Sequence, residues 1–310
     1  MKIASGIFIF DGCIEGPDDP VLRTELFGGT RFKYADLSMP GLNNAFLYND
    51  DKYTEWPDKT MAAAEQSNIK FIQAHSMDCD YYDESKRGYT LGLIKRQIDI
   101  CGRLGIPQIV VHAVYRKGNT WKEFREANEC FYNSLTDSAE RNGVAVLLEN
   151  GCYKNTGGNY YLLSAELILE TINDLKNHPL FNVCWDTGHA HLQGVNQYKE
   201  IMELGSRLKG LHIHDNDGNS DLHQAPFLGN CNFDDVIRGL IDSGYGGYFT
   251  LEAYPAEPAG FPFIKRRGYD NKNNSSDRLI DLPSGLVIKA ADLMYDVAAY
   301  MLSRYGCYEE

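Results

Sequence analysis

Basic residues are scarce in this sequence relative to acidic ones. Its 310 residues include 30 lysines and arginines against 43 aspartates and glutamates, which gives a formal net charge of −13 and a pI near 5.1. A surface that follows the phosphate backbone of a nucleic acid needs dense Lys and Arg. The charge balance therefore argues against nucleic acid as a partner.

Two other features are missing: the cysteine spacings of disulfide or zinc-knuckle frameworks, and apolar runs that could span a bilayer. The eight cysteines include no C-x-x-C pair, so we expect reduced thiols that lie mostly in the core. The apolar run at residues 3–10 is too short for a spanning helix, and no small-residue cleavage pattern follows it. We therefore expect a cytoplasmic protein without a membrane segment.

The sequence does contain an alternation of short apolar runs and helical patterns. The runs are rich in β-branched and aromatic residues, and near-continuous apolar character is typical of strands covered on both faces. This alternation predicts an α/β fold, a (β/α)8 barrel. Because no linker or low-complexity tract divides the chain, we predict a single domain over residues 1–310. The predicted strands are 2–10, 31–38, 69–76, 108–114, 144–150, 182–187, 210–214 and 248–253.

Caps and helix breakers indicate where several helices begin and end. Apolar residues at a spacing of three to four over 91–104 predict an amphipathic helix that Gly105 terminates. Thr120 and Glu123 form a capping-box pattern for a helix that reaches about Arg141. Further predicted elements are a helix capped by Asn232, a final helix at about 287–303, and a long loop at about 255–283 of the kind that often forms a functional lid.

Histidines and carboxylates stand where the predicted strands end. In a (β/α)8 barrel, functional side chains lie at these positions. A single histidine there is more often structural, but buried carboxylates need a cation or a donor, and such residues recur on six successive strand ends. The candidate site residues are His75, His112, Glu149, Asp186, His189, His212, His214 and Glu252, with Asp221 and His223 in the loop after the seventh strand.

These residue types predict a divalent-metal centre. Imidazole nitrogens and carboxylate oxygens suit Zn, Mn, Fe, Co or Mg, and a cluster without thiolates favours a catalytic over a structural metal. His212 and His214 share one face of a strand, so we take His212 as the ligand. His214 then orients a ligand, contacts substrate, or is a buried hydrogen-bonded histidine. His178 and His191 are interpreted as structural.

Five short segments together resemble the xylose isomerase-like TIM barrels, a superfamily that includes sugar-phosphate isomerases and epimerases, ketose 3-epimerases and endonuclease IV. Each segment alone is short, and their order and spacing carry the resemblance, which runs from about His75 to Glu252. The segments are Val-Leu-Leu-Glu-Asn at 146–150, Trp-Asp-Thr-Gly-His at 185–189, Leu-His-Ile-His-Asp-Asn-Asp-Gly at 211–218, Asp-Leu-His at 221–223 and Thr-Leu-Glu at 250–252.

The resemblance implies two different ligand sets. The mononuclear sugar epimerases hold one metal with two Glu, one Asp and one His, which correspond to Glu149, Glu252, Asp186 and His212. Similarity to endonuclease IV implies instead a trinuclear site, and the five further ligands would be His75, His112, His189, Asp221 and His223.

The sequence departs from both patterns. Leu222 stands where endonuclease IV has Arg, and Gly229-Asn230-Cys231 replaces its Gly-x-Gly. Asp217 lies near the position at which ketose epimerases carry a substrate-binding Arg. The first two departures weaken the nuclease reading, and the third leaves the substrate undefined.

We therefore predict a metal-dependent isomerase or epimerase of a sugar or sugar phosphate, which transfers a proton through an enediolate with Glu149 and Glu252 as catalytic residues. The alternatives are an endonuclease IV-like phosphodiester hydrolase and a sugar-binding barrel without activity. The identity of the sugar, the metal and its number, and a homo-oligomeric state stay open. Lys265, Arg266 and Arg267 lie in the long loop, where barrels often bind phosphate, but a solvated loop explains them better.

Overall fold

The computed structural model describes residues 1–10, 19–39, 41, 45, 47–49, 53–253 and 283–310. The predicted loop at about 255–283, with Lys265, Arg266 and Arg267, lies outside the described residues except for Pro283. Within these ranges, no helix is both long and apolar enough to cross a membrane.

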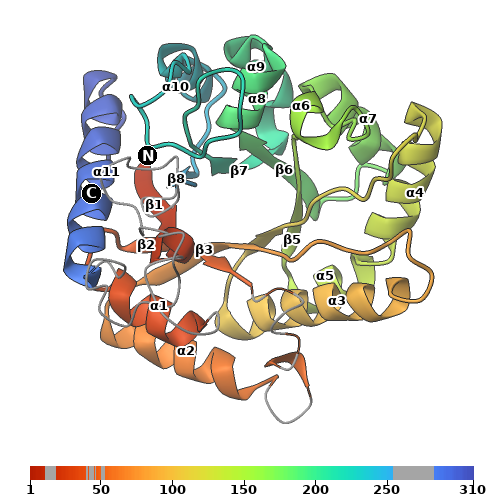
Figure 1. Ribbon diagram of the computed structural model, residues 1–310, viewed down its shortest axis with the longest axis horizontal. Coiled ribbons are helices and arrows are strands. Elements are labelled where there is room, and N and C mark those ends of the chain that lie inside the picture. Colours follow the sequence, from red (N-terminus) through yellow and green to blue (C-terminus); the bar gives the residue numbers. More distant parts are fainter. Residues whose placement is uncertain (11–18, 40, 42–44, 46, 50–52, 254–282) are drawn as a thin grey trace, which may run out of the picture.

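A parallel β-barrel forms the centre of the described part of the chain (Figure 1). Neighbouring strands pair in the order β7-β6-β5-β4-β3-β2-β1-β8, and Ile213 next to β7 bridges Leu251 of β8 in parallel, which closes the barrel. The predicted (β/α)8 barrel is confirmed with each of its strands, but two strands are clearly shorter than predicted: residues 7–10 form a 3-10 turn after the first strand, and the fourth strand ends at Val110. The strands are β1 Lys2–Gly6, β2 Tyr34–Ser38, β3 Lys70–His75, β4 Gln108–Val110, β5 Ala145–Glu149, β6 Phe181–Asp186, β7 Leu208–His212 and β8 Tyr248–Leu251.

Helices surround the barrel on its outer side (Figure 1). Their apolar faces and the outward-facing strand residues form one large buried cluster, which explains why the strand sequences are apolar almost throughout. The helices are α1 Pro20–Phe27, α2 Glu55–Gln66, α3 Arg87–Leu104, α4 Trp121–Asn133, α5 Thr136–Asn142, α6 Tyr153–Thr156, α7 Ala165–Asp174, α8 Thr187–Gln193, α9 Gln197–Leu204, α10 Phe233–Asp242 and α11 Ser284–Arg304, with 3-10 turns η1 Ile7–Phe10 and η3 Gly205–Arg207.

Most of the predicted helix boundaries are confirmed. Gly105 ends α3 in the left-handed region with φ 66°, and the capping box of Thr120 and Glu123 begins α4. Asn232 caps α10 by accepting the N–H of Asp235. The capping residues therefore determine where these helices lie against the barrel.

The predicted single helix from Thr120 to about Arg141 is wrong, because it divides into α4 and α5. The Ser134 hydroxyl donates to the Phe131 carbonyl at the end of α4, and Leu135 turns inward to full burial. Local hydroxyl bonding of this kind competes with the helical backbone bonds. The apolar spacing continues across the break, which is why the pattern alone predicted one helix.

Candidate metal centre

The strands bring the candidate side chains to one end of the barrel. His75, Glu149 and His212 are the last residues of β3, β5 and β7, and Asp186 is the last residue of β6. Glu252 directly follows β8, His189 lies in the first turn of α8, and the remaining candidates lie in the loops after β4 and β7. Since parallel strands all end on the same face, residues far apart in sequence meet there.

A central group consists of Glu149, Asp186, His212 and Glu252. Each offers one ligand atom, and these four atoms lie within 4.8 Å of one another. His212 Nδ1 is 3.0 Å from Glu149 Oε1 and 3.4 Å from Glu252 Oε2. All four residues are at most 6% exposed, so three carboxylates share a site that water barely reaches. Such an arrangement needs compensating positive charge.

Groups of three ligand residues adjoin the centre, and two of them contain the five further candidates. His75, His112 and Glu149 form one of them, with the two histidine Nε2 atoms 3.5 Å and 3.0 Å from Glu149 Oε2. The other consists of His189, Asp221 and His223. In this second group the Nε2 atoms of the histidines lie 3.2 Å and 3.5 Å from Asp221 Oδ2. The structure thus brings together all nine residues that the two ligand sets contain.

The histidines of the flanking groups each have Nδ1 bound to an acceptor on the outer side. A carbonyl or carboxylate can only accept, so Nδ1 carries the proton, and a neutral ring presents an unprotonated Nε2 to the group. This orientation is the one that metal-ligating histidines need. The contacts are His75 to Ser76 O at 2.9 Å, His189 to Asn150 O at 2.9 Å, His223 to Glu252 O at 3.0 Å and His112 to Asp78 Oδ1 at 2.9 Å.

Asp78 is a member of the site that the sequence did not reveal. It follows β3 by three residues, and its carboxylate fixes the ring of His112. Residue type does not distinguish it from the neighbouring Asp80 and Asp83, because the contact depends on how the loop folds. Its position just beyond a strand end is the one signal that points to it.

His214 lies behind the central group. Its Nε2 is 3.1 Å from both carboxylate oxygens of Asp186, and its ring stacks on His223 at a centroid distance of 4.0 Å. A Cβ on Gly188 would lie 1.9 Å from the ring, so glycine at this position makes room for it. The geometry favours the interpretation of His214 as a residue that orients Asp186, although its ring nitrogen could also join Glu252 in a ligand group.

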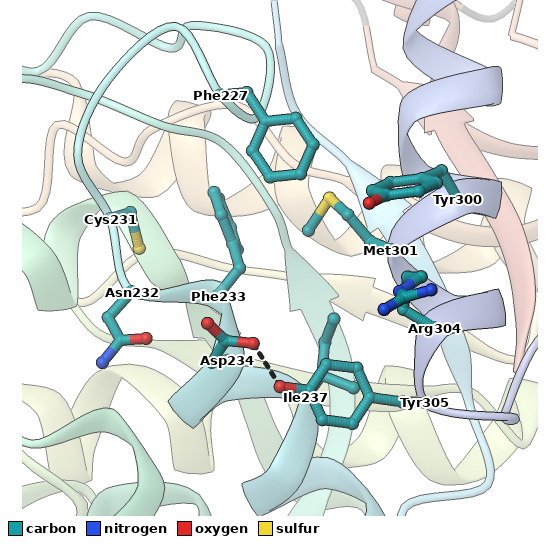
Figure 2. A pocket seen from close by; sticks show the side chains of 10 residues that line it. All are labelled: Phe227, Cys231, Asn232, Phe233, Asp234, Ile237, Tyr300, Met301, Arg304 and Tyr305. Atoms are coloured by element: carbon teal, nitrogen blue, oxygen red, sulfur yellow. Dashed lines mark hydrogen bonds between the residues drawn. The ribbon is translucent and has the colours of Figure 1, made fainter.

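The two histidines interpreted as structural lie away from these groups. His178 Nε2 is 3.0 Å from Glu140 Oε1, and His191 contacts Asn230 Oδ1. A separate hollow of about 310 Å³ lies in the outer layer between α10 and α11 (Figure 2). None of the candidate ligands is among its lining residues in the described part of the chain.

The electrostatics of the cluster are those of tightly paired opposite charges. Burial alone would raise the pKa of Glu149, but the adjacent His212 and His112 hold that pKa well below its ordinary value. Burial opposes protonation of His112, yet Glu149 and Asp78 raise its pKa to about 10. In a metal-free protein the imidazolium protons therefore neutralise the carboxylates.

The donor set fits a divalent cation. Buried carboxylates that require positive charge, together with imidazoles whose outer nitrogens are already occupied, form the ligand environment of Zn, Mn, Fe or Co sites. The central group offers three oxygens and one nitrogen from four residues. The flanking groups extend the same chemistry to both sides.

The fold and the site together define a class of protein: a parallel barrel with a candidate metal centre at the carboxyl ends of its strands. Within it, the chain belongs to the xylose isomerase-like TIM barrel family, whose model matches residues 32–267. The predicted family resemblance is confirmed.

Curated relatives match part of the chain. It is 31% identical over 184 residues to an uncharacterized protein of Sinorhizobium fredii (strain NBRC 101917 / NGR234), which covers 57% of each chain. It is 27% identical over 175 residues to a fructoselysine 3-epimerase of Shigella flexneri, which covers 55% of this chain and 60% of that one. A probable endonuclease 4 of Acholeplasma laidlawii (strain PG-8A) is 24% identical over 176 residues, or 53% and 59%. The chain thus spans less than two thirds of the length of these relatives.

Solved structures of sugar epimerases share the fold over nearly the whole chain. The D-psicose 3-epimerase from Clostridium cellulolyticum H10, in crystal structures with D-tagatose, superposes with a TM-score of 0.73 over 97% of this chain and 99% of that one. The sequences are 17% identical, so this likeness concerns the fold.

Proposed function

We propose that this chain is a metal-dependent isomerase or epimerase that acts on a sugar or sugar phosphate. The observation that carries the proposal is the buried central group, in which Glu149 and Glu252 both approach the same nitrogen of His212. The family and the named sugar epimerases among its relatives support the same reaction class.

The central group divides the work of such a reaction among its side chains. A divalent ion bound there would supply Lewis-acid polarisation of the substrate's carbonyl and hydroxyl oxygens. Asp186 is held for this purpose by its own contacts, because it accepts the N–H of His189 at 2.6 Å while His214 fixes its other oxygen. His212 and Asp186 therefore keep their positions while Glu149 and Glu252 transfer protons from and to the substrate.

Proton transfer falls to Glu149 and Glu252. One carboxylate takes the proton from the carbon next to the carbonyl, and the C–H electron pair moves into an enediolate. The other carboxyl group returns a proton to the opposite face of the same carbon in an epimerisation, or to the neighbouring carbon in an isomerisation. The two residues come from β5 and from the end of β8, so they reach the cluster from different sides of the barrel.

A second candidate function is supported by the flanking groups. Three adjacent ligand sets suit several close cations, which is the arrangement used to hydrolyse phosphodiesters. Against this function, the segment between β3 and α3 is acidic, and its Asp78 touches the cluster directly. The other acids there are Asp80, Asp83 and Glu84. Negative charge beside the cluster repels a polyanionic duplex, so we retain the isomerase as the proposal.

Solvent hydrogen exchange tests the proposal. The protein, loaded with Mn²⁺ or Zn²⁺, is incubated in D2O with a panel of ketoses, aldoses and their phosphates, and deuterium in the sugars is measured by mass spectrometry. We expect metal-dependent exchange that Glu149→Gln and Glu252→Gln each reduce by about 10²-fold or more. Glu140→Gln, an exposed change outside the cluster, serves as the matched control and should exchange like the wild type.

The same preparations distinguish the other functions. Metal-dependent incision of abasic DNA that Glu252→Gln abolishes, with no exchange on any sugar, would replace the isomerase by the hydrolase. A chain that binds a sugar without exchange or incision would be a binding protein. A metal count per chain supports this comparison, because one ion fits the central group alone and three fit all the groups.

A further inference from the structure

A buried polar chain crosses the barrel interior beneath the central group. Its first member is Asp36 on β2, which is buried and whose carboxylate contacts Gln73 and His212 within the barrel. The pairing of β2 with β3 shifts at this residue, so that Ala35 pairs with Phe71 but Asp36 pairs with Gln73. Such irregularities interrupt a ladder and redirect side chains. Here the shift sets a carboxylate and an amide side by side within the barrel.

Gln73 connects Asp36 to His212. Its Nε2 donates to Asp36 Oδ2 at 2.6 Å and lies 3.1 Å from His212 Nε2. A Cβ on Gly210 of β7 would lie 2.5 Å from Gln73 Oε1, so a side chain at that position would displace the amide. Glycine in β7 thus leaves the space that Gln73 occupies.

Gln108 secures the other end of this chain. Its Nε2 donates to Gln73 Oε1 at 3.2 Å and to the carbonyl of Lys209 at 3.1 Å. The pairing of β6 with β7 also shifts here, since Val183 pairs with Leu208 but Cys184 pairs with Gly210. Both irregular strand pairs therefore lie at one polar network, in which Gln73 is central and contacts Asp36, Gln108 and the ring of His212.

His212 differs from the other cluster histidines in the nitrogen that it presents. Its Nδ1 faces Glu149 and Glu252, so Nε2 is the nitrogen that faces away from the central group. A neutral ring that offers Nδ1 as a ligand must carry its proton on Nε2, and that proton needs an acceptor. The amide nitrogen of Gln73 is nearer, at 3.1 Å, but it is itself a donor and cannot accept this proton. The acceptor in reach is the carboxylate of Asp36, whose Oδ2 lies 3.6 Å from Nε2. Asp36 Oδ1 is buried, and no described group donates a hydrogen bond to it.

We propose that Asp36 is the positioning residue for His212. It accepts the Nε2 proton of the ring, directs Nδ1 toward the metal position, and is itself held in place by Gln73. At 3.6 Å this contact is longer than a hydrogen bond, so the proposal requires the carboxylate to rotate toward the ring when Nε2 carries the proton. This inference rests on the proposed metal-dependent function, and it adds a residue on β2, a strand that supplies none of the nine ligand candidates.

The test measures Zn²⁺ affinity in Asp36 variants of the full chain. Metal-free wild type, Asp36→Ala and Asp36→Asn are titrated with Zn²⁺ against a chromophoric chelator. Loss of an acceptor behind a ligating histidine typically costs 10- to 100-fold in metal affinity, and we expect this loss in Asp36→Ala. Asp36→Asn keeps an accepting oxygen without the charge, so its Zn²⁺ affinity should lie between those of the wild type and Asp36→Ala. This variant replaces Asp36→Ala in the test if Asp36→Ala does not fold.

A matched control separates positioning from stability. Asn182→Ala also removes a buried polar side chain from a strand of the same barrel, but its partner is Pro179 O rather than a member of the cluster. We expect wild-type Zn²⁺ affinity in this variant. Thermal unfolding of the metal-free proteins checks that both variants fold.

A spectroscopic readout reports on the ring itself. In the Zn²⁺-loaded wild type with isotope-labelled histidine, we expect a slowly exchanging Nε2 proton of His212 in the NMR spectrum, assigned by its loss in His212→Gln. In Asp36→Ala this proton should exchange faster and shift upfield. Zn²⁺ affinity and an Nε2 proton unchanged in Asp36→Ala would overturn the inference while leaving the proposed function intact. A wild type that binds no Zn²⁺ would instead overturn both.

Discussion

At the scale of the residue, the site depends on which atom each side chain presents. The sequence predicted histidines and carboxylates at strand ends, and the structure adds the orientation of each imidazole. His189, for example, donates from Nδ1 to the carbonyl of Asn150 and leaves Nε2 toward Asp221. His212 has the opposite orientation, with Nδ1 toward the cluster. Residue type could be read from the sequence, whereas orientation depends on neighbours that pack from other strands.

The cysteines give a prediction at this scale. Burial raises the pKa of Cys184 to about 12 and that of Cys231 to about 12, whereas Cys130 is exposed. Because the thiolate is the reactive form, we expect iodoacetamide at pH 8 to label Cys130 rapidly in the native protein. Cys184 and Cys231 should react only after unfolding, and peptide mass spectrometry with and without denaturant measures the difference.

This labelling pattern also tests the interpretation of the cysteines as reduced core thiols. Rapid native labelling of Cys184 would contradict the packing of the barrel interior, where it contacts Val110 and Leu147. Cys13 lies outside the described residues, so its rate carries no expectation.

At the scale of the element, the loop after β7 is held by a single buried carboxylate. Asp215 accepts backbone N–H bonds from Asn216, Phe227, Gly229 and Cys231, at 2.9 to 3.0 Å. A Cβ at Gly229 would lie 2.4 Å from Asp215 Oδ1, so the loop backbone approaches the carboxylate closely. The same loop carries Asp221 and His223, and its folding therefore brings one flanking ligand group to the barrel.

We predict that Asp215→Ala loosens this loop. Buried N–H groups without an acceptor are costly, so the free energy of unfolding should fall by about 2–4 kcal/mol. Because the loop carries Asp221 and His223, the number of metal ions per chain should also fall, while the central group retains its ion. Chemical denaturation and metal analysis after dialysis measure the two effects.

Phe227→Gly is the control for this prediction. Phe227 has a φ of 77°, which strains a bulky residue but suits glycine, and its half-exposed ring faces Tyr300 in the outer hollow (Figure 2). The variant keeps the N–H that Asp215 accepts. We expect unfolding within about 1 kcal/mol of the wild type, because relief of strain offsets the added freedom of glycine in the unfolded chain. Equal metal loss in both variants would refute the role given to Asp215.

At the scale of the whole molecule, the sequence predicted the barrel because apolar runs and strand-end polar residues are local patterns. The positions of Glu149, Asp186 and His212 follow from those patterns, since each ends its strand. Asp36 and Asp215 could not be identified in this way. An isolated carboxylate in a strand or loop has no periodic signal, and its role appears only when a shifted strand pair or a folded loop brings partners to it.

The cluster also couples the stability of the whole barrel to metal and pH. Burial opposes protonation of His223, but Asp221 and Glu252 raise its pKa to about 9. Burial also opposes protonation of His212, but Cys184, Glu252 and Glu149 raise its pKa well above the ordinary value. Between pH 6.5 and about 9 the folded metal-free protein thus holds protons that the unfolded chain releases. The contribution of these protonated histidines to the free energy of unfolding is therefore fully present below pH 6.5 and declines as pH rises toward 9.

We predict that the stabilisation by metal increases with pH across this window. Bound metal requires unprotonated imidazoles, so the loaded protein lacks the protons whose loss destabilises the metal-free form. The difference in unfolding free energy between loaded and chelated protein should therefore widen by up to about 1.4 kcal/mol per pH unit for each proton displaced. At an ion concentration a thousand times Kd, the stabilisation itself should be about 4 kcal/mol. Thermal unfolding with Mn²⁺ or with chelator, at pH 6.5 and pH 8.5, measures both quantities. Equal differences at the two pH values would show that the metal displaces no protons. If the chelator had no effect on unfolding, the proposed metal centre would be wrong.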